Sequence, residues 1–262
     1  MSLAAYIDVD HQDVIGFPLK EVAQSVGDGV DHLFLAAATP EQLALAKAEI
    51  DDPLDDAFVT GIRIAEPGDI PRTMTACLED SRARGHDWCL LVQADTVATP
   101  GSLAAVREWT QDQRTPVHLA ARIGKLSLDF GSGWGHTLVP AAGIVRFHGD
   151  GLGEGCKDPS EWVQRPESWC LEIGYLSIPQ FARHNRQHAK TWAAAGWWLP
   201  EWVELAERDP RRLLVEQYNK RRAADLPLQH ILDVHSGFAP YLDRFVSDEE
   251  RRLVEEVLEE LR

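Results

Sequence analysis

The chain has 262 residues, enough for one large domain or two smaller ones with a hydrophobic core. Hydrophobic residues make up 44% of the sequence and charged residues 26%, which is typical of a globular protein and excludes wholesale disorder. The formal net charge of −16 repels a phosphate backbone, so general nucleic-acid binding is not expected. A small anionic ligand such as a nucleotide is compatible with this charge if a divalent cation neutralises it.

The four cysteines form no C-x-x-C pair, so neither a structural zinc site nor a disulfide framework is expected. They are Cys77, Cys89, Cys156 and Cys170. The sequence starts without a basic segment or a long apolar run, so no signal peptide is predicted. No apolar stretch has the length that a membrane-spanning helix needs. These features favour a cytoplasmic protein with reduced thiols.

The first hundred residues alternate between strand-like and helix-like stretches. Strand–helix alternation with short links predicts a parallel sheet with helices on both faces, and such sheets bind ligands beyond the carboxyl ends of their strands. Thr39 is a good helix N-cap, because a proline follows it and Gln42 stands three residues on. The expected strands are Ala4–Val9, His32–Ala37, Phe58–Ile64 and Trp88–Val92, and the expected helices are Pro18–Val26, Thr39–Ile50, Ile70–Ala83 and Leu103–Gln111.

After Arg114 the pattern changes to short strands that are separated by glycines. These expected strands are Val117–Ile123, Lys125–Phe130, Thr137–Val139 and Gly143–His148. From Pro179 the chain is mostly helical, with helices expected from Phe181 to Trp192 and from Asp248 to Arg262. The predicted fold class is therefore α/β, a mixed sheet flanked by helices with a mainly helical C-terminal part. We expect a catalytic domain over residues 1–178 and a helical extension over residues 179–262 that packs on it.

Residues 87–103 carry a motif at the end of the fourth expected strand. They read Asp-Trp-Cys-Leu-Leu-Val-Gln-Ala-Asp-Thr-Val-Ala-Thr-Pro-Gly-Ser-Leu. This segment resembles the metal-binding segment of GT-A-fold glycosyltransferases, especially the large inverting family of bacterial enzymes, in which an Asp-Trp-initiated strand ends in Asp-x-Asp before a proline and a helix. The resemblance covers roughly residues 4–150. It implies a GT-A-like, Rossmann-related fold and a nucleotide-sugar donor.

The resemblance also assigns nucleotide-sugar-binding positions. In the family the second acid of Asp-x-Asp touches the metal and the first contacts the ribose or sugar; here these positions are Asp95 and Gln93. Gln93 can hydrogen-bond a hydroxyl but adds no charge. Arg72 lies in a segment that lines the nucleotide pocket in the family. The second strand lacks the acid that reads the base in many relatives, and Asp8 and Asp10 are the nearest substitutes.

A nucleoside diphosphate leaving group gains negative charge as the glycosidic bond breaks. Mg²⁺ or Mn²⁺ stabilises this charge, and hard cations prefer carboxylate ligands. Asp95 is the expected ligand, although one carboxylate does not hold a cation tightly without phosphates, waters and another side chain. The family often uses a later His or Asp, and His148 is our candidate for this second ligand.

An inverting transferase also needs a general base that takes the proton from the acceptor hydroxyl. The glycine-rich stretch 149–155 offers Asp150 and Glu154, and Asp150 is preferred because it stands two residues from His148. Asp158, Glu161 and Glu172 are further options. Trp134, Trp162 and Trp169 are able either to stack on a sugar or to pack against the sheet.

The leading hypothesis is a metal-dependent glycosyltransferase that moves a sugar from a UDP- or GDP-sugar to an unidentified acceptor hydroxyl, with inversion implied by the resemblance. A sugar nucleotidyltransferase shares this layout, but such enzymes carry a glycine-rich, basic signature after the first strand, where this chain has Asp10-His11-Gln12-Asp13. A degenerate, non-catalytic binding or scaffolding protein is the third reading, since Gln93 replaces an acid.

Overall fold

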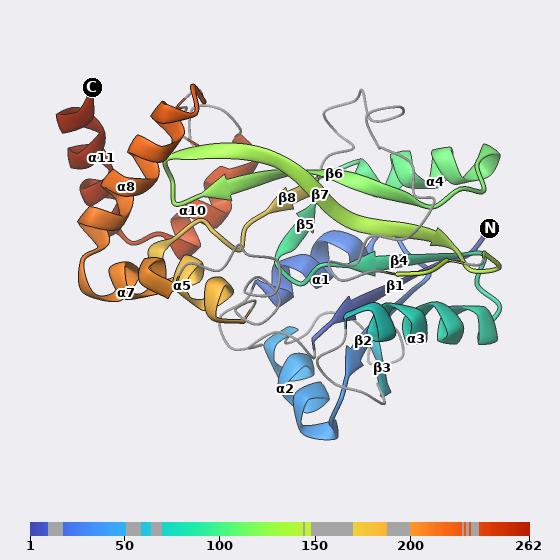
Figure 1. Cartoon of the computed structure of the whole chain (residues 1–262). Coiled ribbons are helices and arrows are strands. Elements are labelled where there is room, and N and C mark those ends of the chain that lie inside the picture. Colours follow the sequence, from blue (N-terminus) through green and yellow to red (C-terminus); the bar gives the residue numbers. More distant parts are fainter. Residues whose placement is uncertain are drawn as a thin grey trace. The chain divides into compact units, whose positions relative to one another are not determined.

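The computed structural model describes residues 1–9, 18–50, 59–63, 70–143, 145–147, 170–187, 200–226, 228, 231 and 236–262. The chain divides into two compact units (Figure 1). The first comprises Met1–Ala121 and Gly133–Leu171, and the second comprises Arg122–Ser132 and Glu172–Arg262. The predicted domain division after residue 178 stays a prediction, because compactness does not establish independent folding. Within the described ranges, no helix is both long and apolar enough to cross a membrane.

The first unit is built around four parallel strands in the order β3-β2-β1-β4. They are β1 (Leu3–Asp8), β2 (His32–Ala37), β3 (Val59–Arg63) and β4 (Trp88–Val92). The helices between and after them are α1 (Leu19–Gly27), α2 (Pro40–Ile50), α3 (Ile70–Ala83) and α4 (Ser102–Asp112). Each strand and helix predicted in this half is present, so the expected strand–helix alternation is confirmed.

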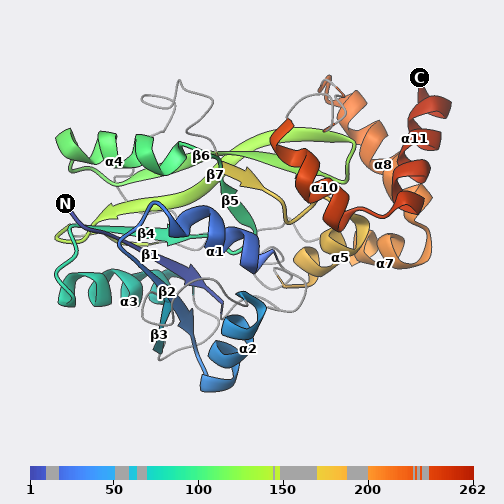
Figure 2. The same ribbon diagram turned by 180° about the vertical axis from the view of Figure 1, so that it is seen from behind.

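Helices cover both faces of these strands (Figures 1 and 2). On one face, Cys77 and Leu78 of α3 share a buried cluster with Tyr6 and Phe34. Successive side chains of a strand point to opposite faces, so Leu3, Ala5 and Ile7 face the other way, toward the side of α1 and α4. Coverage on both sides explains why the strands are continuous apolar runs instead of alternating ones.

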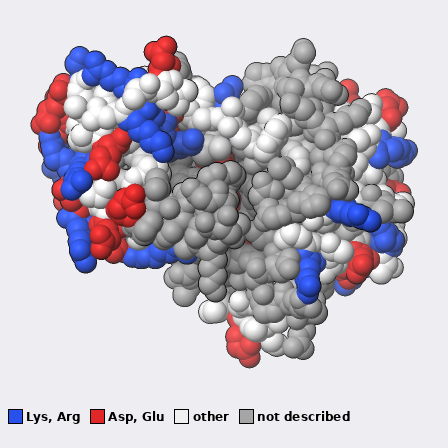
Figure 3. Space-filling model, viewed as in Figure 1, with Lys and Arg blue, Asp and Glu red and all other residues white. Residues whose placement is uncertain are grey.

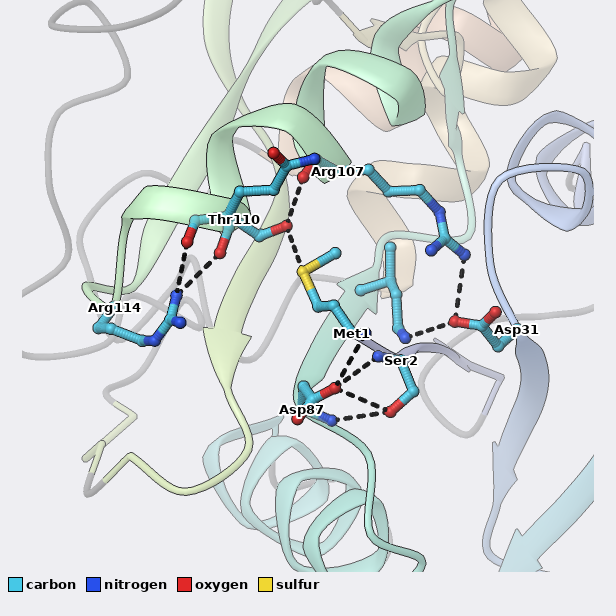
Figure 4. Close-up of polar contacts among 9 residues, drawn as sticks. Met1, Ser2, Asp31, Asp87, Arg107, Thr110 and Arg114 are labelled. Atoms are coloured by element: carbon cyan, nitrogen blue, oxygen red, sulfur yellow. Dashed lines mark hydrogen bonds and ion pairs between the residues drawn. The ribbon is translucent and has the colours of Figure 1, made fainter.

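The amino-terminal ends of β1 and β4 are held by a network of side-chain carboxylates (Figure 4). The backbone N–H of Ser2 donates to Asp87 at 2.6 Å, and that of Leu3 donates to Asp31 at 2.7 Å. Asp31 also pairs with Arg107 of α4 at 3.1 Å. Although burial acts to raise the pKa of Asp31, the bonds from Leu3 and Arg107 outweigh it and lower that pKa. Asp87, the first residue of the motif 87–103, therefore stabilises the amino-terminal ends of β1 and β4.

The predicted succession of short strands after Arg114 is correct only in part: Val117–Ile123 and Thr137–Val139 lie within strands, but Lys125–Phe130 does not form one. Two long strands, β6 (Val117–Lys125) and β7 (Asp129–Pro140), replace the first three, and the residues expected as the strand Lys125–Phe130 contain the turn between them. Leu126 and Ser127 adopt positive φ angles of 52° and 56° in this turn. Residues with positive φ break a strand, which apolar composition alone does not reveal.

The expected strand Gly143–His148 is also wrong in its described part, because Val145 and Arg146 lie outside regular secondary structure. The glycines of β7 lie within a strand instead of in turns. A Cβ atom on Gly135 would lie 3.1 Å from the Cβ of Cys170, which is tighter than most Cβ contacts, so a side chain there would make its neighbours shift slightly.

The strands of the described residues form one eight-stranded sheet in the order β3-β2-β1-β4-β7-β6-β8-β5. The two short members are β5 (Thr96–Ala98) and β8 (Cys170–Glu172). β7 pairs with β4 in the antiparallel sense, with Leu91 opposite Thr137. The predicted α/β fold class, a mixed sheet flanked by helices and followed by a mainly helical C-terminal part, is confirmed, whereas its GT-A-like character stays a prediction.

The second unit combines the tip of the β6–β7 hairpin with helices. These are α5 (Ile178–Gln187), α7 (Pro200–Arg208), α8 (Pro210–Ala223), the 3₁₀ turn η3 (Ser236–Phe238), α10 (Ala239–Phe245) and α11 (Asp248–Leu261). Leu126 and Leu128 of the hairpin pack with apolar residues of α5, α8 and α11 in one buried cluster. On the face in Figure 3, acidic and basic side chains are interspersed over these helices, and exposed pairs such as Arg212–Glu216 contribute little each.

One ion pair of the second unit is buried. Asp129 at the start of β7 pairs with Arg221 of α8, and their side chains are only 3% and 12% exposed. The Oδ1 atom of Asp129 and the Nε atom of Arg221 have no hydrogen-bond partner among the described residues. Loss of either charge therefore leaves the other buried without compensation.

We expect Arg221→Met to lower the free energy of unfolding by about 3–5 kcal/mol, the usual cost of breaking a buried pair. Urea denaturation measures this loss. Arg222→Met, at an exposed position of the same helix, is the control and should change stability little. Adding Asp129→Leu to Arg221→Met should recover much of the loss; a single variant as stable as the parent would contradict a role for the pair.

Glu250 of α11 makes a bond that its sequence context does not predict. Ser247 caps α11 and accepts from the Glu250 backbone N–H at 3.2 Å, as in a capping box. The Glu250 carboxylate does not complete that box; it accepts from the backbone N–H of Ile178, at the start of α5, at 2.7 Å. Burial raises the pKa of Glu250 from 4.5 to about 7, although this hydrogen bond acts to lower it.

Between these two pKa values the folded protein binds more protons at Glu250 than the unfolded chain, so its contribution to stability falls as pH rises from 4.5 to about 7. We expect Glu250→Gln to remove this dependence. The variant should gain stability relative to the parent across that window, by at most about 3 kcal/mol. Chemical denaturation at several pH values tests this, with exposed Glu249→Gln as control; parallel parent and Glu250→Gln curves would refute it.

Candidate functional site

The segment that follows β4 forms a compact polar turn. The Thr96 backbone N–H donates to the Gln93 carbonyl at 3.2 Å, which closes a four-residue turn over Gln93–Thr96. The Thr96 hydroxyl lies 3.1 Å from the Oε1 of Gln93 and 3.2 Å from the Oδ1 of Asp95, and it gives its single hydrogen to one of them at a time. Asp95 is 4% exposed, whereas Gln93 is exposed. The turn thus places three side-chain oxygen atoms in a small volume.

Two contacts behind the turn fix its position. The backbone N–H of Ala98 in β5 donates to the Oγ of Ser25 in α1 at 3.0 Å. Leu103 of α4 lies against Gly29, where an added Cβ atom would be 2.4 Å from the Leu103 Cβ. A larger residue at Gly29 would therefore displace α4. The segment between β4 and α4 is consequently held from the α1 side.

Asp8 lies beside this turn because of strand register. Ile7 of β1 is paired with Val92 of β4, so the next residues along the two parallel strands are Asp8 and Gln93. The chain proceeds from β1 to β2 and β3 on one side and returns to β4 on the other, so β1 and β4 flank a topological switch point. Ligands of open α/β sheets bind in the crevice beyond the strand ends at such a point.

Arg72 belongs to the same edge of the sheet. It is an exposed residue in the first turn of α3, the helix that follows β3, and a helix that connects parallel strands begins at their carboxyl ends. The structure therefore brings four of the sequence-predicted residues, Asp8, Arg72, Gln93 and Asp95, to the carboxyl edge of the parallel strands. Three of them carry charge, and the arginine supplies a donor fork suited to phosphate.

A histidine that the sequence analysis did not select adjoins the turn. His136 of β7 is 0% exposed, and its Nδ1 accepts a hydrogen bond from the Gln93 backbone N–H at 3.3 Å. Burial lowers the pKa of His136 to about 4, although the charge of Asp95 acts to raise it. The imidazole is thus neutral at physiological pH and does not compensate the carboxylate charge.

The donor set of the turn fits a hard divalent cation in its chemistry. Asp95 offers a carboxylate, Gln93 an amide oxygen and Thr96 a hydroxyl, and Mg²⁺ and Mn²⁺ prefer such oxygen ligands. Among the described residues, no group of three or more His, Cys, Asp or Glu side chains comes together as a complete cation site. A cation held by Asp95 would need further ligands to complete its coordination.

Trp134 is an exposed residue of β7, with 44% of its surface accessible. Its ring centroid lies 5.8 Å from that of His118 in β6, and the His118 Nδ1 lies 2.9 Å from the Thr137 hydroxyl. The indole is therefore available for contact with a ligand, although the structure gives it an aromatic neighbour that explains its presence equally well.

Several predicted site residues fall outside the described part of the chain. They are Asp10, His148, Asp150 and Glu154, with Asp158, Glu161, Trp162 and Trp169. Glu172 ends β8 and is 9% exposed. Among the described residues, Cys77, Cys89 and Cys170 are buried free thiols.

The sequence around His136 gives no local signal that this residue belongs to the site. His136 follows Gly131, Gly133 and Gly135, which suggested turns between short strands. The signal that mattered is long-range: β7 pairs with β4, and this pairing brings His136 to the end of the β4 strand. Nothing near residue 136 encodes that partner.

No protein-family model matches the sequence, and no curated protein is similar to it. Similar solved structures include a mannosyltransferase from Pyrobaculum calidifontis in complex with GDP-Man and Mn²⁺, with 13% identity and a TM-score of 0.41, covering 98% of this chain and 84% of that one. A mannose-1-phosphate geranyltransferase from Thermus thermophilus has 13% identity and a TM-score of 0.40, covering 54% of this chain and 58% of that chain.

A third similar structure is 4-diphosphocytidyl-2C-methyl-D-erythritolsynthase from Anaerococcus prevotii, with 9% identity and a TM-score of 0.38, covering 53% of this chain and 71% of that one. This chain thus spans little more than half the length of the Thermus protein. Similarity at these levels does not identify a reaction or a substrate, so the function has to be inferred from the residues of this chain.

Proposed function

We propose that the protein is a metal-dependent glycosyltransferase that transfers a sugar from a UDP- or GDP-sugar to an acceptor hydroxyl, with inversion at the anomeric carbon. The observation that carries the proposal is the pairing of β1 with β4, which sets Asp8 beside the Gln93–Thr96 turn at the switch point of the parallel sheet. A nucleotide bound beyond the carboxyl ends of β1 and β4 would lie against Asp95. Arg72, at the same edge of the sheet, would be within reach of it.

The charges of the edge suit a diphosphate only when a cation is present. Asp8 and Asp95 repel phosphate, whereas Mg²⁺ or Mn²⁺ held by Asp95 would neutralise the diphosphate and stabilise the charge of the leaving group. Arg72 would bind phosphate oxygens directly. Gln93, in place of the first acid of the Asp-x-Asp motif, would hydrogen-bond a ribose or sugar hydroxyl, while Trp134 would offer a surface for stacking.

We expect Asp95→Asn to abolish metal-dependent nucleotide binding while the fold is retained, because the amide removes the one charged ligand of the turn. Isothermal titration with GDP and UDP, each with and without Mn²⁺, measures the effect, and the melting temperature reports on folding. Asp112→Asn, at an exposed position of α4, is the matched control and should bind as the parent does. Unchanged nucleotide affinity in Asp95→Asn would remove Asp95 from the site.

The general base is proposed from the sequence alone, with Asp150 preferred over Glu154 and with His148 as the further cation ligand. We expect Asp150→Asn to retain donor affinity and to lose roughly two orders of magnitude in the rate of sugar transfer, as is typical when a general base is removed. Steady-state kinetics with equilibrium binding separates the two effects, and Glu154→Gln is the comparison. Parent-like turnover of Asp150→Asn would transfer the role to another acid.

The presence of Gln93 in place of an acid favours one alternative, a non-catalytic nucleotide-sugar-binding protein. This alternative predicts nucleotide binding that depends on Mn²⁺ but no release of nucleoside diphosphate from UDP-glucose or GDP-mannose, with or without acceptor. Glycosyl transfer or slow hydrolysis of the donor excludes it. Gln93→Asp restores the acid and would strengthen cation binding, whether the protein is a glycosyltransferase or a non-catalytic binding protein.

A further inference from the structure

We propose that His136 is a ligand-binding residue of this site and that its Nε2–H donates a hydrogen bond to an oxygen atom of the bound nucleotide sugar. The inference rests on the proposed function, since it assigns a partner to the ligand of the same site. Apart from Arg72, the other polar side chains of the site mainly offer oxygen atoms as acceptors, so His136 would add an uncharged hydrogen-bond donor. Three observations carry it.

The first observation fixes the hydrogen atoms of the ring. The Gln93 backbone N–H donates to Nδ1 of His136 at 3.3 Å, so Nδ1 uses its lone pair as an acceptor and carries no hydrogen. A neutral imidazole with an unprotonated Nδ1 has its hydrogen on Nε2. His136 therefore presents a donor at Nε2, and neither nitrogen is free to coordinate a cation.

The second observation is that this donor has no acceptor. The Nε2 atom of His136 is buried and makes no hydrogen bond with the described residues, in a side chain that is 0% exposed. Buried donors are normally paired, because a donor removed from water without an acceptor loses its hydration and gains nothing in exchange. A ligand oxygen would supply the missing acceptor on binding.

The third observation is the position of the ring. Its Nδ1 accepts a hydrogen bond from Gln93, the first residue of the turn that contains Asp95. In the proposed site, a ligand held at this turn would have oxygen atoms in the neighbourhood of His136. Both phosphate and sugar hydroxyl oxygens accept such a bond, and neutral His136 would favour them without competing for the cation.

The tautomer and the contact are measurable in the parent protein. In long-range ¹H–¹⁵N spectra of histidine-labelled protein, with Mg²⁺ as a diamagnetic cation, His136 should show an unprotonated Nδ1 and a protonated Nε2. Its Nε2–H resonance should shift when GDP-mannose or UDP-glucose is added, whereas the ring signals of His32, at the amino-terminal end of β2, should not. A shift with the nucleoside diphosphate alone assigns the acceptor to a phosphate; a shift that needs the sugar nucleotide assigns it to the sugar.

Two substitutions separate the donor from the structural role of the ring. His136→Asn keeps an acceptor near the position of Nδ1 but has no donor at Nε2, and His136→Gln places an amide donor near the position of Nε2. We expect His136→Asn to weaken nucleotide-sugar binding roughly tenfold, the effect of one hydrogen bond, while His136→Gln binds closer to the parent. His32→Asn is the control, since His32 begins β2 and therefore lies at the opposite, amino-terminal edge of the parallel strands.

The outcomes are distinguishable from those that test the proposed function. A parent protein that binds no nucleotide with Mg²⁺ or Mn²⁺ overturns both proposals before any variant is made. If Asp95→Asn abolishes binding but His136→Asn binds as the parent does, the proposed function stands and the role of His136 is overturned. If His136→Asn does not fold, the spectra of the parent decide: an Nε2–H resonance that is unmoved at saturating ligand, or a hydrogen on Nδ1, overturns the inference.

Discussion

The in-register pairing of β1 with β4 is the constraint on which the site depends. Ile7 stands opposite Val92, so the first polar residues beyond both strands, Asp8 and Gln93, emerge side by side. At the other end of the strands, Asp31 and Asp87 bind the backbone N–H groups of residues 3 and 2. A slip of one residue would turn every side chain of β1 to the other face, so burial on both faces makes this register strongly preferred.

The polar turn after β4 shows how a nearly buried carboxylate is accommodated. The Thr96 hydroxyl lies within hydrogen-bond distance of the Gln93 side-chain oxygen, the Thr96 backbone N–H donates to the Gln93 carbonyl, and His136 accepts from the Gln93 N–H. Because the imidazole is uncharged, the negative charge of Asp95 is not cancelled from this side. In the proposed function, a divalent cation would be the counterpart of this carboxylate, which is only 4% exposed.

The second unit uses its charges differently. Asp129 and Arg221 neutralise each other inside the helical unit, and Glu250 joins the starts of α5 and α11 by accepting from the Ile178 N–H. If one of these buried groups loses its partner, a polar atom is left unpaired in the interior. The contacts therefore favour one arrangement of the helices and the hairpin within this unit. The exposed ion pairs of the same helices contribute mainly a surface with mixed charge.

The sequence by itself determined the features that depend on neighbouring residues. Thr39 and Gln42 form the expected capping box, with both reciprocal bonds at 3.1 Å, and the apolar run Trp88–Val92 is the buried strand that leads to Asp95. Only the tertiary structure decided which distant segments meet. The pairing of β7 with β4 brings His136 to Gln93, which lies 43 positions away in the sequence. The Glu250 side chain accepts from the Ile178 N–H, 72 positions away, instead of completing the capping box at the start of α11. Local periodicity fixes the type of an element, but the choice of partner depends on the burial and hydrogen bonding of the whole chain.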